Sequence, residues 1–228
     1  MNKSCVILGA GPSIGLSVAK QFASKGYNLG LGSRNKSNYP EILQLSTIEN
    51  VDFRQYKVDA SIEKQVIDFV AAAEDELGKI SIGIYNPSKF VKKSVLALSS
   101  QDIEEAWRVS CLGGFIFARE LVKRMLDRNK GTIIFTGATA GMRGSKDFAA
   151  FAIGKFGLRA LAQSMAREFH PKGIHIIWAN IDGVVKESNT DESFINPNDI
   201  AKYYYQLHSQ PKSAWSHEVE VRPWNEHF

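Results

Sequence analysis

The glycine-rich segment near the start of the chain has the residue types and spacing of a phosphate-binding turn. Gly9-Ala10-Gly11-Pro12-Ser13-Ile14-Gly15 follows a short apolar run and leads directly into a helical pattern. A glycine turn between a strand and a helix lets backbone N–H groups and the positive end of the helix face a pyrophosphate. The segment therefore predicts a dinucleotide site, although a tight turn alone would also favour glycine. The residues expected to contact the nucleotide here are Gly9, Gly11, Ser13, Ile14 and Gly15.

The sequence Gly32-Ser33-Arg34-Asn35 follows the second apolar run, at the position that distinguishes the two nicotinamide dinucleotides. A carboxylate there would hydrogen-bond a ribose 2′-hydroxyl, whereas a basic side chain would bind a 2′-phosphate. Ser33 and Arg34 supply a hydroxyl and a guanidinium with no carboxylate, so we expect NADP(H) to be favoured over NAD(H). The alternative is that Arg34 is a solvated loop charge.

Short apolar runs recur along the chain and predict the strands that must position these turns. They cover residues 6–8, 29–31, 51–58, 80–84, 132–135, 174–178 and 219–221. Stretches with helical spacing lie between most of them, including one that begins after Ser61. Because the strand runs are mostly continuous and not alternating, we expect burial on both faces, as in a parallel sheet covered by helices. The expected fold is α/β, a doubly wound parallel sheet of Rossmann type with about seven strands, in one domain of residues 1–228.

Two predicted helices are longer than the others and cover residues 100–129 and 147–169. Ser99 and Asp102 give the first of them a start similar to a capping box. The second is rich in alanine, glycine and serine, and small side chains allow another helix to approach closely. We therefore expect a homodimer or homotetramer through the two long helices, the alternative being a helix buried within a monomer.

A polar stretch without periodicity covers residues 181–196 and follows the carboxyl end of a predicted strand. Doubly wound sheets bind ligands at that end of their strands. We therefore expect residues 181–210 to form a substrate-side loop and helix. The stretch has no recognisable motif, so the sequence does not specify the substrate.

The composition is that of an ordinary globular protein, with 44% hydrophobic and 23% charged residues. It excludes a disordered chain, a collagen and a disulfide scaffold. The net charge of +4 is too small to imply a nucleic-acid partner. Two cysteines, Cys5 and Cys111, have no spacing typical of a metal site or a disulfide. This cysteine usage fits a reducing cytoplasm, so we expect a cytoplasmic protein, and its expected partner is a small-molecule substrate. No segment is long enough to span a membrane.

The chain resembles the short-chain dehydrogenase/reductase family from Val6 to about Val221. The resemblance is strongest in four segments, which are the glycine turn, Tyr85-Asn86-Pro87-Ser88, residues 136–141 and residues 151–155. It implies hydride transfer between a nicotinamide and a carbonyl or alcohol. It also implies that Asn86 shapes the cofactor pocket, that Lys155 holds the nicotinamide ribose and that Asp59 contacts the adenine. Asp59 alternatively only helps to open the helix that follows Ser61.

The same resemblance shows which catalytic groups are replaced. In the family a tyrosine donates the proton, a serine polarises the carbonyl, and an asparagine organises a relay water beside the lysine. Those three positions fall on Phe151, Ala138 and Cys111, and only Lys155 remains. Losing a general acid costs roughly 10²–10⁴ in rate, and losing one oxyanion donor costs roughly 10²–10³. The chain thus resembles a divergent subgroup that keeps the cofactor-binding positions and has an incomplete active-site motif.

Four side chains are candidates to replace the missing groups, each with a structural alternative. The Thr139 hydroxyl either serves as a donor beside Ala138 or is bonded locally to the backbone. Tyr85 either reaches the pocket or is a core aromatic residue. Cys111 is either a reactive thiol or a packed helical cysteine. Asp182 is either a replacement acid or base or a helix cap.

Two functions remain open at this point. The first is an NADP(H)-dependent oxidoreductase with a nonstandard or weakened proton donor. The second is a catalytically inactive, NADP-binding homo-oligomer that senses the state of the cofactor or acts as a scaffold.

Overall fold

The strands of the computed structural model, which describes residues 3–35, 39–188 and 191–225, form one parallel sheet. Its order is β3-β2-β1-β4-β5-β6-β7. The bounds are β1 (Lys3–Leu8), β2 (Tyr27–Ser33), β3 (Phe53–Lys57), β4 (Ile80–Tyr85), β5 (Gly131–Thr136), β6 (Ile174–Ile181) and β7 (Glu218–Val221). The order reverses between β1 and β4, which creates a switch point at their carboxyl ends. The predicted doubly wound parallel sheet is confirmed.

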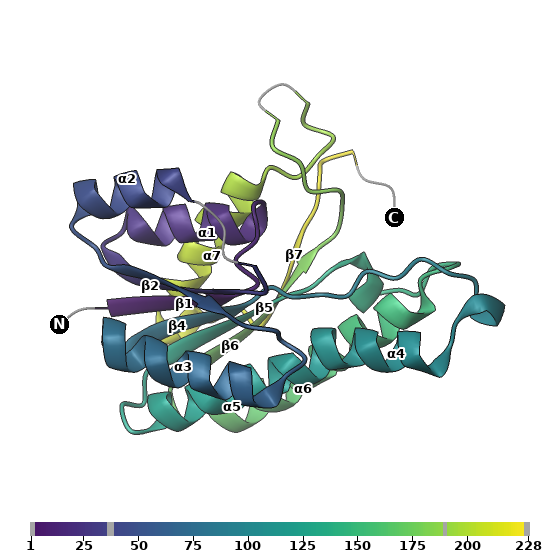
Figure 1. The fold of residues 1–228 in the computed structure, drawn as a ribbon, viewed down its shortest axis with the longest axis horizontal. Coiled ribbons are helices and arrows are strands. Elements are labelled where there is room, and N and C mark those ends of the chain that lie inside the picture. Colours follow the sequence, from purple (N-terminus) through teal and green to yellow (C-terminus); the bar gives the residue numbers. More distant parts are fainter. Residues whose placement is uncertain (1–2, 36–38, 189–190, 226–228) are drawn as a thin grey trace.

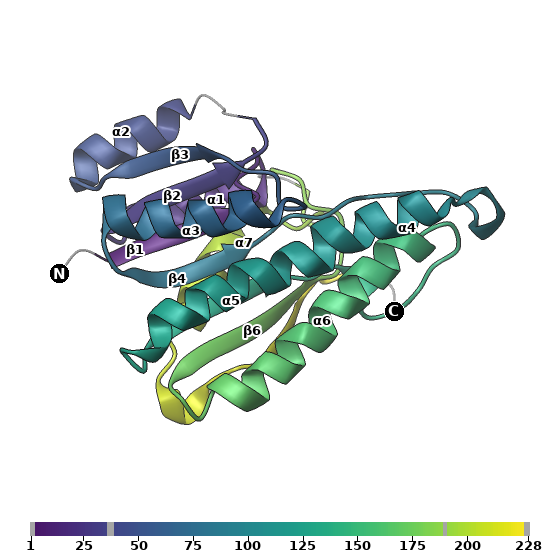
Figure 2. The same cartoon turned by 60° about the horizontal axis from the view of Figure 1, so that its bottom comes forward.

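Helices cover both faces of this sheet (Figures 1 and 2). One layer consists of α1 (Ile14–Ala23), α2 (Pro40–Glu49) and α7 (Pro197–His208), and the other of α3 (Glu63–Leu77), α5 (Gly113–Leu126) and α6 (Ala149–Phe169). Each layer has its own apolar core. Ile7 packs with Phe22 in the first, whereas Leu8 packs with Phe117 in the second. Neighbouring residues of a strand point to opposite faces, so β1 must be apolar at successive positions to fill both cores.

The long helix predicted for residues 100–129 is interrupted. It consists of α4 (Ser100–Trp107), a π-helical turn (Arg108–Leu112) and α5, which ends at Leu126. The Tyr85 hydroxyl, fully buried at the end of β4, donates to the carbonyl oxygen of Val109 within the turn. This bond depends on a residue from a different element, which explains why helical periodicity did not reveal the interruption. The predicted capping box at Ser99 and Asp102 is confirmed.

Other predicted boundaries shift by a few residues. The edge strand β3 is shorter than the predicted run of residues 51–58. Helix α6 begins at Ala149, because Asp147 has a positive φ of 69° that the helix cannot contain. The predicted loop after β6 has one isolated bridge, between Val185 and Ile195, and leads to α7. Residues 189–190 of this loop lie outside the described residues. Among the helices of the described ranges, none is long and apolar enough to cross a membrane.

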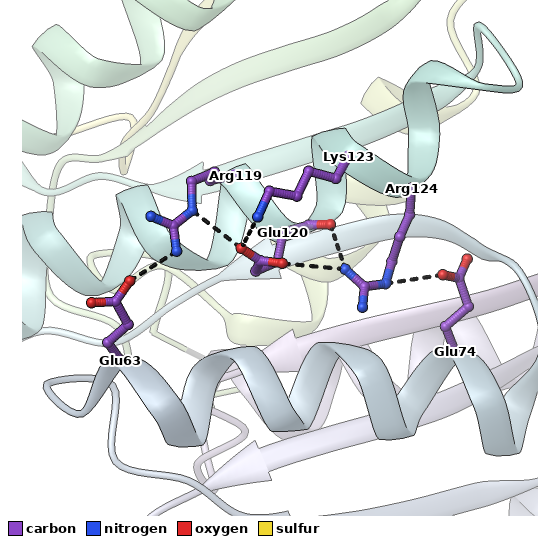
Figure 3. Close-up of polar contacts among 6 residues, drawn as sticks. All are labelled: Glu63, Glu74, Arg119, Glu120, Lys123 and Arg124. Carbon is purple, nitrogen blue, oxygen red and sulfur yellow. Dashed lines mark hydrogen bonds and ion pairs between the residues drawn. The ribbon is translucent and has the colours of Figure 1, made fainter.

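An ion network around Glu120 joins α5 to α3 (Figure 3). The Glu120 side chain is 6% exposed and accepts hydrogen bonds from three cations of its own helix, Arg119, Lys123 and Arg124. Two of these cations also reach α3, where Arg119 pairs with Glu63 at 2.8 Å and Arg124 pairs with Glu74 at 3.0 Å. The nearly buried carboxylate therefore organises the polar contact between the two helices.

Candidate functional site

Glycines build a turn between β1 and α1 that only glycine can form. Gly9 has a φ of 86°, which side chains disfavour. A Cβ atom on Gly15 would lie 2.6 Å from the Gly9 carbonyl oxygen, so α1 can begin this close to β1 only without a side chain. The Ser13 hydroxyl does not cap α1. Ser13, Ile14 and Gly15, at the start of the helix, line the adjoining cleft, an arrangement that fits a bound phosphate.

Several hydrogen bonds hold the glycine turn in place. The side-chain amide of Asn86, at the carboxyl end of β4, donates to the Gly9 carbonyl oxygen at 2.9 Å. The backbone N–H groups of Gly9 and Ala10 donate to the Gly32 carbonyl oxygen at 2.9 and 3.1 Å. The buried Tyr39 hydroxyl donates to the Ala10 carbonyl oxygen. The sequence reasoning missed Tyr39, because no local pattern links a tyrosine after β2 with the turn after β1.

A cleft of about 960 Å³ opens at the switch point between β1 and β4. It is lined by the glycine turn, the end of β2, the segment before α3 and the segment after β4. Four predicted cofactor contacts outside the glycine turn line it together, which are Ser33, Arg34, Asp59 and Asn86. The Ser33 hydroxyl donates to the Asn35 carbonyl oxygen at 2.6 Å, and Arg34 is exposed at the cleft. The end of β2 thus presents a cation to this cleft.

Asp59 has a structural partner beside the same cleft. Its carboxylate accepts hydrogen bonds from the Ser61 backbone at 2.9 Å and from the Ser61 hydroxyl at 2.7 Å. Burial raises the pKa of the Asp59 carboxyl, but the Ser61 bonds and the charge of Arg34 outweigh it, so the net pKa is lowered. Asp59 therefore stabilises the local turn that precedes α3 and also presents an ionised carboxylate to the cleft.

A second cleft of about 320 Å³ adjoins the first at Gly11 and Asn86. It extends past the first turn of α1 to the carboxyl end of β5, where Ala138, Phe151 and Lys155 line it together. Of the described residues that line it, Lys155 alone has an ionisable side chain. The structure thus brings together at this cleft three of the four predicted catalytic positions.

Lys155 is buried beneath this second cleft. Its side chain comes from α6, the residue is 2% exposed, and Nζ donates to the Thr136 carbonyl oxygen at 2.8 Å. Burial lowers the pKa of Lys155 to about 7, because the charged form loses hydration. The amine therefore loses its proton more readily than an ordinary lysine side chain does.

Phe151 lies one helical turn before Lys155 and contributes to an apolar wall. Its ring centroid is 5.4 Å from that of Phe90, and Phe90 is 5.5 Å from Phe148. We call Phe90, Phe148 and Phe151 the phenyl cluster. None of the three rings has a proton to give, and Ala138 presents only a methyl group to the cleft.

The hydroxyl of Thr139 and the carboxylate of Asp182 bind each other. Thr139 Oγ1 donates to Asp182 Oδ1 at 2.5 Å, and Asp182 is fully buried. The guanidinium groups of Arg143 and Arg222 lie 3.4 and 3.7 Å from the same carboxylate. This cluster ties the loop after β5 to the ends of β6 and β7. Any catalytic role of Thr139 remains a prediction, since its proton is directed to Asp182 in this arrangement.

Cys111 lies in the π-helical turn and faces α6. A Cβ atom on Gly157 would lie 2.9 Å from its Sγ, and burial raises the pKa of the thiol, which opposes thiolate chemistry. Cys111 is absent from the described lining of both clefts. The preceding residue, Ser110, is fully buried, and its Oγ accepts from the Lys89 N–H at 3.3 Å. The π-helical turn therefore directs Ser110, and not Cys111, toward the segment after β4.

Comparison with known proteins identifies relatives along the whole fold. The family model described as short chain dehydrogenase matches residues 3–194. A short-chain dehydrogenase from Rhodopseudomonas palustris is 37% identical, with a TM-score of 0.85 over 98% of this chain and 100% of that chain. An alcohol dehydrogenase from the archaeon Thermococcus sibiricus, complexed with 5-hydroxy-NADP, is 20% identical, with a TM-score of 0.88 over 99% of each chain.

A curated short-chain dehydrogenase/reductase of Armillaria gallica is 29% identical over 174 residues, which are 75% of this chain and 67% of that protein. By its sheet order, by the family model and by its 37% identity with a solved relative, the chain belongs to the short-chain dehydrogenase family of oxidoreductases.

Proposed function

We propose that the protein is an NADP(H)-dependent oxidoreductase that transfers hydride to or from a small carbonyl compound or alcohol, with a nonstandard proton donor. The observation that carries this proposal is the pair of adjoining clefts. Together they are lined by all the predicted cofactor contacts, and Lys155 lies at the end where the chemistry would occur. When bound, the nicotinamide would supply or accept the hydride.

The chain's own residues would hold the dinucleotide in an extended position across the switch point. The N-terminus of α1 would bind the pyrophosphate, because its N–H groups are not capped by Ser13. Asn86 would keep the glycine turn in its binding shape through the bond to Gly9. Lys155 would donate to the nicotinamide ribose from below the second cleft.

Arg34 supports the preference for the phosphorylated dinucleotide. Its exposed guanidinium lies at the cleft with Ser33, and a guanidinium binds a phosphate through paired hydrogen bonds. The Thermococcus sibiricus enzyme, which has the same fold, is complexed with a phosphorylated dinucleotide, 5-hydroxy-NADP. Asp59 also lines this cleft, but its carboxylate is bonded to Ser61.

The test is to restore the replaced groups. The double variant Phe151→Tyr with Ala138→Ser adds a phenol and a hydroxyl to the second cleft, and Phe148→Tyr adds a phenol to the same phenyl cluster outside the described lining of that cleft. NADPH oxidation is followed by absorbance with a panel of aldehydes and ketones. We expect the double variant to be faster than wild type by at least about 10², and Phe148→Tyr to match wild type.

Equal rates in all three proteins, with NADPH bound to each, would contradict the assignment of these positions. The second candidate function, an inactive cofactor-binding protein, is favoured by the loss of polar groups at Phe151 and Ala138. It predicts NADPH binding with no turnover by the wild-type protein over the whole panel.

We also propose that the protein is a cytoplasmic homodimer or homotetramer. Large apolar side chains are 39–46% exposed on α4, α5 and α6, namely Trp107, Phe115, Ile153 and Phe156. Such a group on neighbouring helices is typical of a contact between subunits. The two unpaired cysteines agree with a reducing compartment. Sedimentation velocity tests the assembly, and a monomer at micromolar concentration would contradict it.

A further inference from the structure

Among the described residues that line the second cleft, Lys155 alone has an ionisable side chain. This lining includes Phe151 and Ala138, which have no proton to give, and Lys155, which has three. One Lys155 proton is directed to the Thr136 carbonyl oxygen at 2.8 Å. In the described structure the Lys155 ammonium therefore has more N–H donors than acceptors that bind them.

The titratable groups on the elements around Lys155 are engaged elsewhere. Asp182, at the end of β6, pairs with Thr139, Arg143 and Arg222. Tyr204 on α7 donates to Thr136 Oγ1 at 3.0 Å, and burial raises its pKa. Among the described residues, Nζ of Lys155 has no carboxylate partner.

Tyr85, from β4, is another phenol near this end of the sheet. Its fully buried hydroxyl donates to the Val109 carbonyl oxygen, and burial raises its pKa well above the ordinary value. A phenol that holds its proton this firmly and points into the π-helical turn is a poor donor for a cleft that it does not line.

We propose that Lys155 itself is the general acid of this protein, and in the reverse direction the general base. The hypothesis rests on the proposed oxidoreductase function. As hydride adds to the carbonyl carbon, the C=O π electrons move to oxygen. That oxygen forms a bond to a proton of the Lys155 ammonium while the N–H bond breaks. The resulting neutral amine regains a proton from water.

The surroundings of Lys155 suit this role. A general acid works best when its pKa lies near the operating pH, and burial lowers the pKa of Lys155 to about 7. Phe151 lines the same cleft with an apolar ring, and Lys155 is only 2% exposed. A lysine also tolerates the loss of its charge in a buried site, whereas an arginine stays protonated.

The decisive comparison is between Lys155→Arg and wild type. Arginine keeps a cation and several donors beneath the second cleft, so it can hold the ribose, but it does not release a proton in the working pH range. NADPH binding is measured by fluorescence, and reduction is measured with 4-nitrobenzaldehyde as the first of a panel of aldehydes and ketones. We expect Lys155→Arg to bind NADPH within about threefold of wild type and to lower kcat by at least about 10².

A second variant tests whether the Lys155→Arg protein still has a folded site. Phe151→Tyr in the Lys155→Arg background supplies a phenol one helical turn away, so kcat should rise again if the missing function was proton donation. Unchanged kcat in Lys155→Arg would overturn the inference, because a cation alone would then be sufficient. A loss in Lys155→Arg that the added tyrosine does not reverse would also count against it.

A readout independent of turnover is the titration of Lys155 itself. With ¹³C-labelled lysine, the Cε signal that disappears in Lys155→Arg should titrate in the free protein with a midpoint near pH 7. The wild-type reduction rate should fall as pH rises through the midpoint measured with NADPH-saturated protein. A midpoint above about 9.5 in the free protein, or a rate that does not follow protonation, would overturn the inference.

These results separate the two proposals. Wild-type protein that fails to bind NADPH contradicts the proposed function. Binding with no wild-type turnover over the panel contradicts both proposals, and normal turnover without dependence on Lys155 protonation contradicts the inference alone.

Discussion

Replacing Lys155 with methionine should stabilise the protein, and the gain should depend on pH. Lys155 holds its proton up to about pH 10.5 in the unfolded chain but only to about pH 7 in the fold. Between these values the unfolded state binds more protons, so the free energy of unfolding of wild type rises with pH. Below about pH 7 the folded protein bears the full cost of burying the protonated Lys155 amine, on the order of 5 kcal/mol at about 1.4 kcal/mol per pH unit.

Methionine has a similar shape and no charge, so Lys155→Met removes the penalty and loses about 1 kcal/mol for the hydrogen bond to Thr136. Because the two pKa values differ, the stability advantage of Lys155→Met over wild type should shrink by roughly 2–3 kcal/mol between about pH 6.5 and about pH 9. Urea unfolding followed by circular dichroism at both pH values measures it.

The same substitution at Lys64, whose side chain is 82% exposed, is the control and should change stability by less than about 0.5 kcal/mol at either pH. If the difference between Lys155→Met and wild type were constant over this range, Lys155 would not be an amine held at lowered pKa by burial. The reasoning about the second cleft would then be refuted.

Two further predictions concern charged side chains. Glu120→Gln should lower the free energy of unfolding by about 1–3 kcal/mol, because it removes the carboxylate that binds Arg119, Lys123 and Arg124. The control is Glu104→Gln, at an exposed pair with Arg108, which should lower it by less than about 0.5 kcal/mol. Equal losses in urea unfolding would contradict the importance of burial. Arg34→Glu should weaken NADPH binding by about 10- to 100-fold in a fluorescence titration while leaving NADH binding within about threefold; an unchanged ratio of the two affinities would show that Arg34 does not bind the 2′-phosphate.

Local sequence was sufficient to predict the strands and the glycine turn. The predicted positions of β1, β4 and β5 follow from short apolar runs. The backbone at Gly9 and Gly15 leaves no room for a Cβ atom. These features depend on neighbouring residues only. The sheet order then places Ser33, Asp59 and Asn86 at one cleft without further information.

Features that depend on distant contacts were not predictable in the same way. The π-helical turn that directs Ser110 inward is linked to the Tyr85 hydroxyl, which comes from another element. Thr139 and Asp182 are 43 positions apart and meet only because β5 and β6 are neighbours. The burial that lowers the pKa of Lys155 is likewise a property of the packed site and not of the helix that contains it.

Calorimetric titration of the purified protein with NADPH, and in parallel with NADH, tests the central claim most directly. If the glycine turn, Arg34 and Lys155 form a working dinucleotide site, NADPH should bind at micromolar or lower concentration and at least about tenfold more tightly than NADH. If neither dinucleotide binds, both the dinucleotide site and the proton donor proposed beside it are contradicted.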